Sequence, residues 1–142
     1  MADLNPLIRV RKHVVEQKQK FLAELYRQAE ELENQKKTLL DQLTEEREKS
    51  AEMDSAEMMG YFGRYADAVK DRVKDIDDAV AKLETRIDIA RDDMRNAFAE
   101  LKKIEITQDR REEEEQAEID KKESDELDEI ALEGYRRKVD EG

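Results

Sequence analysis

The sequence predicts an all-α protein, a long antiparallel two-helix coiled-coil hairpin with a C-terminal helical overhang. Helix breakers are rare, with four glycines and one proline in 142 residues. Apolar residues also recur every 3.5 residues through much of the chain, which is the period of a coiled coil. The hydrophobic fraction is 37% and the charged fraction is 46%. These values suit either a disordered acidic chain or long helices with a narrow apolar seam, and the periodicity favours the helices.

The first helix is predicted over about residues 6–48. Asn5 and Pro6 form a start signal, because Asn caps free N–H groups and Pro fits the first helical turn. An apolar stripe follows, although three of its eleven positions are basic. Long basic side chains can lie along a seam while their charges stay in water. The stripe consists of Ile8, Arg11, Val15, Lys18, Leu22, Leu25, Ala29, Leu32, Lys36, Leu39 and Leu43.

A chain reversal is predicted at about residues 49–60. The stripe fades over residues 44–60, and the run Gly60-Tyr61-Phe62-Gly63 is the only glycine cluster in the chain. Either Ser50 or Ser55 could cap the second helix. Methionine and aromatic residues gather here, and they either form an adaptable binding surface or cover the end of the hairpin itself. They are Met53, Met58, Met59, Tyr61, Phe62 and Tyr65.

The second helix, predicted over about residues 61–133, carries the clearest pattern. Alternate steps of four and three give thirteen seam positions, and all of them are apolar. An antiparallel pairing of residues 7–43 with residues 62–104 would match the two stripes in length. The thirteen positions are Phe62, Ala66, Val69, Val73, Ile76, Val80, Leu83, Ile87, Ala90, Met94, Ala97, Leu101 and Ile104.

Beyond Ile104 the seam is expected to end and the helix to continue as an overhang. The next seam positions would be polar, beginning with Gln108 and Arg111. A separate apolar patch then precedes a charged tail at residues 134–142, and it either binds a partner or belongs to a fraying end. The patch consists of Leu127, Ile130, Ala131, Tyr135 and Val139.

Composition excludes several classes of function. The net charge of −12 argues against nucleic-acid binding, which needs phosphate-neutralising Lys and Arg. The chain has no cysteine and a single histidine, His13, which lies three residues before Glu16. This is too few ligands for a transition-metal site, so no metal site is expected. Phosphate-binding loops and nucleophile motifs are absent from the sequence. No apolar run is long enough to span a membrane, and no signal segment is evident at the N-terminus. We therefore expect a cytoplasmic protein without cofactors that is not an enzyme.

Two segments resemble the FliJ family of flagellar export proteins. Residues 100–106, Glu-Leu-Lys-Lys-Ile-Glu-Ile, followed by Asp109-Arg110-Arg111, resemble the family's Lys-Lys-x-Glu…Arg stretch. Residues 127–131, Leu-Asp-Glu-Ile-Ala, followed by the basic residues 136–138, resemble its C-terminal motif. Residues 12–25 align with the family's opening helix without gaps. The resemblance extends over about residues 12–138.

This resemblance implies a role that composition could not show. FliJ proteins resemble the stalk subunit of rotary ATPases: they insert into the ring of the flagellar export ATPase and promote its assembly and turnover. They also contact the cytoplasmic domain of the membrane export gate and handle export chaperones. The resemblance implies that the chain is a monomer when free and associates peripherally with the inner-membrane export apparatus, without entering the membrane. Flagellum biogenesis, type III secretion, chemotaxis and a chaperone-like role are the corresponding processes.

The resemblance also implies which residues contact each partner. The export ATPase would be contacted by Leu101, Lys102, Lys103, Ile104, Arg110, Arg111, Leu127, Asp128, Glu129, Ile130 and Ala131. The export gate would be contacted by Gln35, Leu39, Tyr65 and Val69. Four further positions of the gate contact hold residue types that differ from the family's, namely Gln42, Glu46, Arg72 and Ile76.

The sequence leaves two alternative functions open. The chain could form a parallel coiled-coil homodimer that serves as a scaffold, or it could be a secretion chaperone for one exported substrate. The mass in solution separates the first alternative from a hairpin, because the hairpin is a monomer of 16.7 kDa. A stable complex with a single exported protein, rather than with an ATPase, would identify the second.

Overall fold

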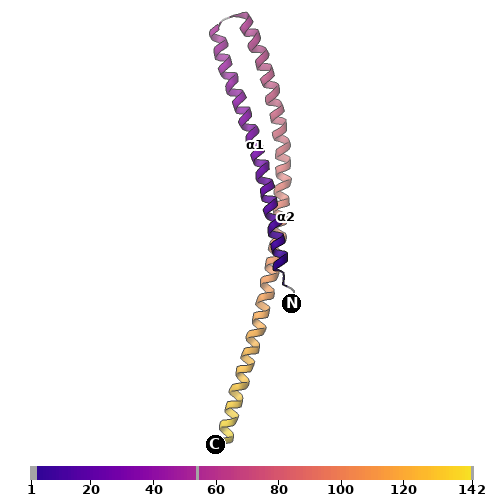
Figure 1. The fold of residues 1–142 in the computed structure, drawn as a ribbon, viewed down its shortest axis with the longest axis vertical. Helices are drawn as coiled ribbons and strands as arrows, with labels where there is room; N and C mark the ends of the chain where they lie inside the picture. The colour runs from indigo at the N-terminus through magenta and orange to yellow at the C-terminus, as the bar shows by residue number, and fades with distance from the viewer. Residues whose placement is uncertain (1–2, 54, 142) are drawn as a thin grey trace. The chain divides into compact units, whose positions relative to one another are not determined.

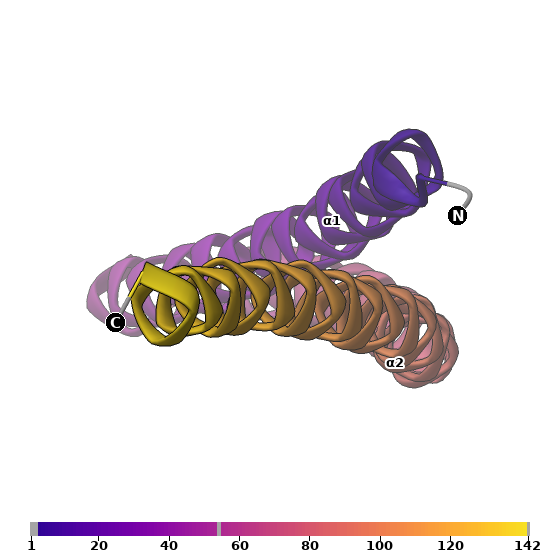
Figure 2. The same ribbon diagram turned by 90° about the horizontal axis from the view of Figure 1, so that it is seen from below.

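The computed structural model describes residues 3–53 and 55–141, which form two α-helices and no strand. Helix α1 spans Asn5–Met53 and helix α2 spans Ala56–Glu141. The two helices pack against each other, which confirms the predicted all-α helical hairpin. The two views draw α1 and α2 as coiled ribbons (Figure 1 and Figure 2).

The chain divides into two compact units. The hairpin unit is Val14–Ala97, and the terminal unit combines Met1–His13 with Phe98–Gly142. In the hairpin unit the magenta part of α1 runs beside the pink part of α2 (Figure 1). The expectation of one domain over residues 1–142 stays a prediction.

The helix boundaries differ from those predicted. Helix α1 continues past residue 48 to Met53, and α2 begins at Ala56, so Gly60 of the predicted turn lies inside a helix, as Gly63 was expected to do. Ser55 provides the cap: its Oγ accepts the Met58 N–H at 3.1 Å, and its carbonyl accepts the Met59 N–H at 3.0 Å. The cap fixes the start of α2 before the glycines, whose helix-breaking effect of about 1 kcal/mol each is too small to end it.

The predicted turn and the predicted end of the second helix also differ from the structure. Of the predicted turn at residues 49–60, Ser55 alone lies outside the helices among the described residues, and residue 54 is not described. The predicted end at residue 133 does not hold either, because α2 runs through Gly134 to Glu141. A single exposed glycine is tolerated when good helix formers surround it.

The core of the hairpin unit is the predicted seam. The thirteen seam positions of α2 are all buried or half-buried, and those from Phe62 to Ala97 lie in the hairpin unit. Two clusters of buried residues lie along the seam, one containing Leu25 and the other Leu43. The first cluster consists of Leu22, Leu25, Leu83, Ile87 and Ala90, and the second of Leu43, Ala66 and Val69.

Polar contacts between α1 and α2 flank this seam. The Lys36 ammonium lies 2.8 Å from an Asp77 carboxylate oxygen, so this basic seam position reaches a partner at the edge. The ion pair raises the pKa of Lys36, chiefly through its hydrogen bond to Asp77. Nearer the other end of the unit, the Arg91 Nε donates to the Tyr26 hydroxyl at 2.7 Å. Exposed contacts of this kind add little stability, but they mark which residues face each other.

The start of α1 in the terminal unit is held by the side chains of Asp3 and Gln108, neither of which was predicted in this role. Asp3, rather than Asn5, acts as the capping side chain, because its Oδ1 accepts the Asn5 N–H at 2.9 Å. The Leu4 N–H donates to the Gln108 Oε1 at 3.1 Å. The Gln108 Nε2 in turn donates to Glu112 at 2.9 Å.

Gln108 corrects the prediction that the seam ends at Ile104. Its side chain is buried, with 9% of its surface exposed, and Arg111 at the following seam position is half-buried. A buried amide is tolerated because both of its polar ends are hydrogen-bonded. The seam therefore continues with polar residues in the terminal unit.

Replacing Gln108 tests this role. We expect Gln108→Ala to cost about 1 kcal/mol in unfolding free energy, because it leaves the Leu4 N–H without its acceptor. Hydrogen exchange of the first α1 amides should accelerate. The matched control is Gln116→Ala, which removes an exposed amide bonded to Asp120. Equal exchange rates in the two variants would show that Gln108 does not hold the N-terminus.

Candidate functional site

The final part of α2, in the terminal unit, exposes an apolar stripe. Every described residue from Glu112 to Glu141 is exposed. Leu127 and Ile130 each have 66% of their surface accessible. With Ala131, Tyr135 and Val139 they recur at steps of three and four, so they share one helix face. Apolar residues that line up on an exposed face mark an interaction site more often than scattered ones do.

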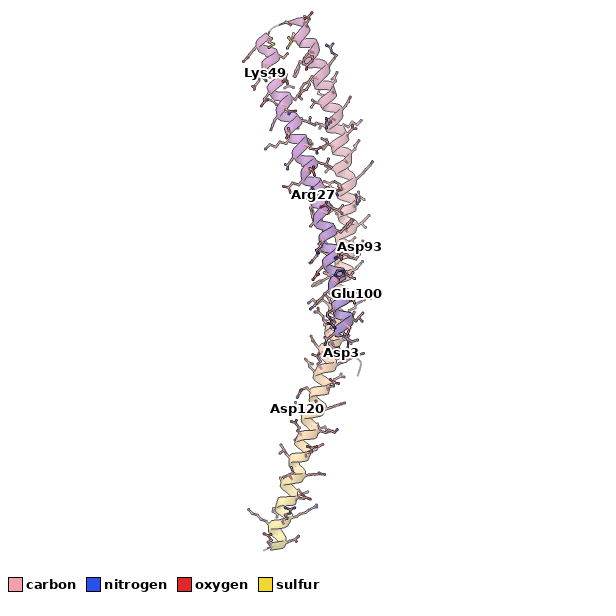
Figure 3. The ribbon with its side chains drawn as sticks, viewed as in Figure 1. Asp3, Arg27, Lys49, Asp93, Glu100 and Asp120 are labelled. Atoms are coloured by element: carbon pink, nitrogen blue, oxygen red, sulfur yellow. The ribbon has the colours of Figure 1, made fainter. Side chains whose placement is uncertain are left out.

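Among the described residues, none packs against this final stretch of α2. Figure 3 shows Asp120 on it, and the Gln116 amide donates to that carboxylate one turn away at 2.9 Å. Glu, Lys, Arg and Leu, which are good helix formers, make up much of its sequence. Because isolated helices are marginal in water, continuity with the rest of α2 supports this stretch.

The residues implied to contact the export ATPase all lie on α2, but they are not equivalent. Leu101 is buried and Ile104 is half-buried, so both serve the seam. Lys102 and Lys103 between them are exposed and pair within the helix with glutamates at 3.3 and 3.4 Å. The first segment of this set is therefore part core and part surface.

The other members of this set lie further along α2. Arg110 is exposed and Arg111 is half-buried. Leu127, Asp128, Glu129, Ile130 and Ala131 are all exposed. The structure thus arranges the set as three segments along one helix and does not gather them into a compact cluster.

The residues implied to contact the export gate lie in the hairpin unit. The structure brings three of them together, because Leu39 and Tyr65 pack against the cluster that contains Val69. Gln35 is exposed and lines an open groove of about 580 Å³ together with Leu39 and Arg72. Arg72 is one of the positions whose residue type differs from the family's.

Sequence reasoning missed a charged group beside this groove. The Arg27 guanidinium lies 2.6 Å from a Glu24 oxygen and 3.2 Å from a Glu31 oxygen, and Arg27 and Glu31 both line the groove. The hydrogen bond from Arg27, helped by one from Gln28, lowers the pKa of Glu24 to about 2. The same pairing raises the pKa of Arg27. The spacings of three and four residues on one helix are the signal that could have identified this group.

The described residues contain no cluster suited to a metal ion. No three His, Asp or Glu side chains come together in the described part of the chain in a way that could hold one. His13 is exposed. Among the same residues, no helix is long and apolar enough to cross a membrane.

The fold and these surfaces define a two-helix coiled-coil protein that offers contact faces along its helices. The family model described as flagellar FliJ protein matches residues 1–140 of the 142-residue chain. The chain belongs to the FliJ family and is therefore a flagellar export-related protein, from a family of non-catalytic export components. No curated protein and no solved structure is significantly similar to the chain.

The lowered pKa of Glu24 predicts how its pairing depends on pH. Because this pKa is about 2 in the folded chain and about 4.3 when unfolded, the pairing stabilises the folded chain above pH 4.3, and this small, solvent-screened stabilisation disappears as the pH falls towards 2. We expect Glu24→Gln to lower the Tm slightly at pH 7, with the difference from the wild type shrinking as the pH falls from about 4.3 to about 2. Thermal melts followed by circular dichroism measure this difference in Tm at each pH.

Glu45→Gln is the control, because Glu45 has no hydrogen-bond or ion-pair partner among the described residues. A Glu24→Gln difference that stays constant over this pH range would contradict the pairing.

Proposed function

We propose that the chain acts as a stalk that inserts into the flagellar export ATPase ring and promotes its assembly and activity. In the same proposal it links the ring to the cytoplasmic domain of the membrane export gate and to export chaperones. It would work as a monomer on the cytoplasmic side of the inner membrane. Membership of the FliJ family supports the general role.

The observation that carries the ATPase contact is the exposed apolar stripe of the terminal unit. Leu127 and Ile130 would lose unfavourable contact with water if the ring covered them. The segment that resembles the family's C-terminal motif, residues 127–131, forms part of this stripe. Neighbouring carboxylates, such as Asp128 and Glu129, would favour a basic surface on the partner.

The hairpin unit supports a separate contact with the export gate. Gln35, Leu39 and Tyr65 are at least partly accessible, whereas Val69 is buried and would act by supporting its neighbours. Because these residues and the apolar stripe belong to different units, one chain could hold both partners at once.

The packing also favours this function over a parallel homodimer scaffold. Within the hairpin unit, the seam of α1 is already covered by α2 of the same chain, so no apolar seam there remains for a second copy. The substrate-specific chaperone remains the second candidate, and it differs in predicting a stable complex with one exported protein.

Substituting the stripe tests the proposal. We expect Ile130→Asp to reduce stimulation of the purified export ATPase by about tenfold or more, because a charge would replace a buried apolar contact. The matched control is Ile89→Asp, since Ile89 is exposed to a similar degree, 59% against 66%, and lies in the hairpin unit. Turnover of ATP with each variant measures the effect.

The result that contradicts the proposal is equal stimulation by wild type and Ile130→Asp, with circular dichroism showing both chains helical. If Ile130→Asp and Ile89→Asp both abolished stimulation of the ATPase, the loss would not be specific to the apolar stripe, and the proposed ATPase contact there would also be contradicted.

A further inference from the structure

A small groove lies in the hairpin unit where α1 ends and α2 begins. We call it the notch, and its volume is about 270 Å³. Phe62 and Met59 of α2 provide its apolar surface, and Met59 is 66% exposed. Its remaining lining residues, Arg47, Ser50 and Ala51, belong to α1.

Ser50 explains why the notch exists. Continuing the α1 seam by steps of four and three from Leu43 reaches Glu46 and then Ser50, so a small polar residue takes a seam position. The register of the pairing sets Ser50 opposite Phe62, and both line the notch. A serine side chain fills much less space than leucine, which leaves the Phe62 ring partly uncovered. The Arg47 guanidinium lies 6.0 Å from the centroid of that ring.

Two glycines follow the apolar residues of the notch. Gly60 comes directly after Met59 and Gly63 directly after Phe62, and they lie three residues apart on one face of α2. A Cβ at either glycine would meet nothing within 4 Å, and neither has a positive φ. Packing within the chain therefore does not require glycine here, and glycine is a poor helix former. Bare backbone at this place suits the close approach of another chain.

The heptad register shows which side of the hairpin carries these glycines. Tyr26 and Arg91, both one residue after a seam d position, contact each other, so the e positions of α1 and α2 face each other. Arg47 and Gly63 are also e positions, and Ala51 and Gly60 are the adjacent b positions. The implied gate residues Gln35 and Tyr65 occupy g positions, on the opposite side of the seam.

The b and e positions on this side of the hairpin unit hold more cations than carboxylates, and Arg47 among them lines the notch. Over residues 37–51 and 60–74, the b and e positions hold four exposed cations and one carboxylate. The described residues offer none of the four cations an ion-pair partner. A local excess of positive charge in a chain of net charge −12 favours an acidic partner at this place. The cations are Lys37, Arg47, Lys70 and Lys74, and the carboxylate is Asp67.

We propose that the notch binds a short acidic segment of another protein, which inserts one apolar side chain over Phe62 and Met59. A carboxylate of that segment pairs with the Arg47 guanidinium, whose planar set of donors suits bidentate binding. The glycine backbone of α2 allows the segment to lie close to the helix. The notch lies on the side of the seam opposite Gln35 and Tyr65, and Phe62 packs against the same buried cluster as Leu39 and Tyr65.

Synthetic octapeptides provide the probe, each with a central leucine flanked by glutamates, serines or lysines. Binding to the full-length chain is followed by fluorescence anisotropy. We expect the glutamate peptide to bind best, and its affinity to fall about tenfold with Arg47→Glu, which reverses the charge that attracts it. We expect a similar loss with the double variant Gly60→Ala, Gly63→Ala, whose methyl groups would occupy the contact surface.

The glycine variants also separate binding from folding. Because alanine is the better helix former and meets no obstacle, the double variant should melt at a higher temperature than the wild type while binding more weakly. Gly134→Ala is the matched control: its surroundings are equally open, and it lies in the terminal unit, so peptide affinity should not change.

Several results would overturn the proposal. These are equal binding of the glutamate and lysine peptides, no binding of any peptide, or unchanged affinity in both notch variants. A wild-type mass in solution of twice 16.7 kDa that returns to the single-chain value in the notch variants would assign the notch to a second copy, and would overturn it as well.

Discussion

The apolar seam between α1 and α2 in the hairpin unit is the constraint on which the other features depend. Two helices can bury only one stripe each, so this seam holds most of the unit's buried residues, and Leu25 is the most deeply buried. The register of the seam decides which residues face each other at its edges, as Lys36 and Asp77 do. It also decides which apolar residues are left exposed. The sparse hydrophobic content of the chain, 37%, is sufficient for such a fold.

The surfaces with functional meaning are the places where apolar residues do not enter the seam. In the terminal unit, the last part of α2 has a stripe containing Leu127 and Ile130 with nothing over it among the described residues. In the hairpin unit, Ser50 at a seam position leaves Phe62 partly uncovered. Each surface also has a distinct charge, acidic around the stripe and basic around the notch. The charge that surrounds each apolar surface gives it a preference for a different kind of partner.

The sequence predicted the helical hairpin because a 3.5-residue apolar repeat has few other solutions, and it predicted the exposed stripe because residues 127–139 lie beyond the apolar seam. It did not predict that α2 begins before Gly60, because the Ser55 cap outweighs the weak helix propensity of that glycine. Gln108 was also missed, since an amide becomes a core residue only when the Leu4 N–H and Glu112 satisfy it. The bond from Leu4 joins residues that are far apart in sequence, so it leaves no periodic signal.

The most direct test of the account is whether the seam forms within one chain. Lys36 and Asp77 lie on different helices with their charged groups 2.8 Å apart, so a zero-length carbodiimide reagent can join them as an amide. The account predicts that mass spectrometry finds the Lys36–Asp77 linkage in a species of 16.7 kDa. Finding that linkage only in a species of twice this mass would contradict the hairpin and with it the assignment of the exposed surfaces.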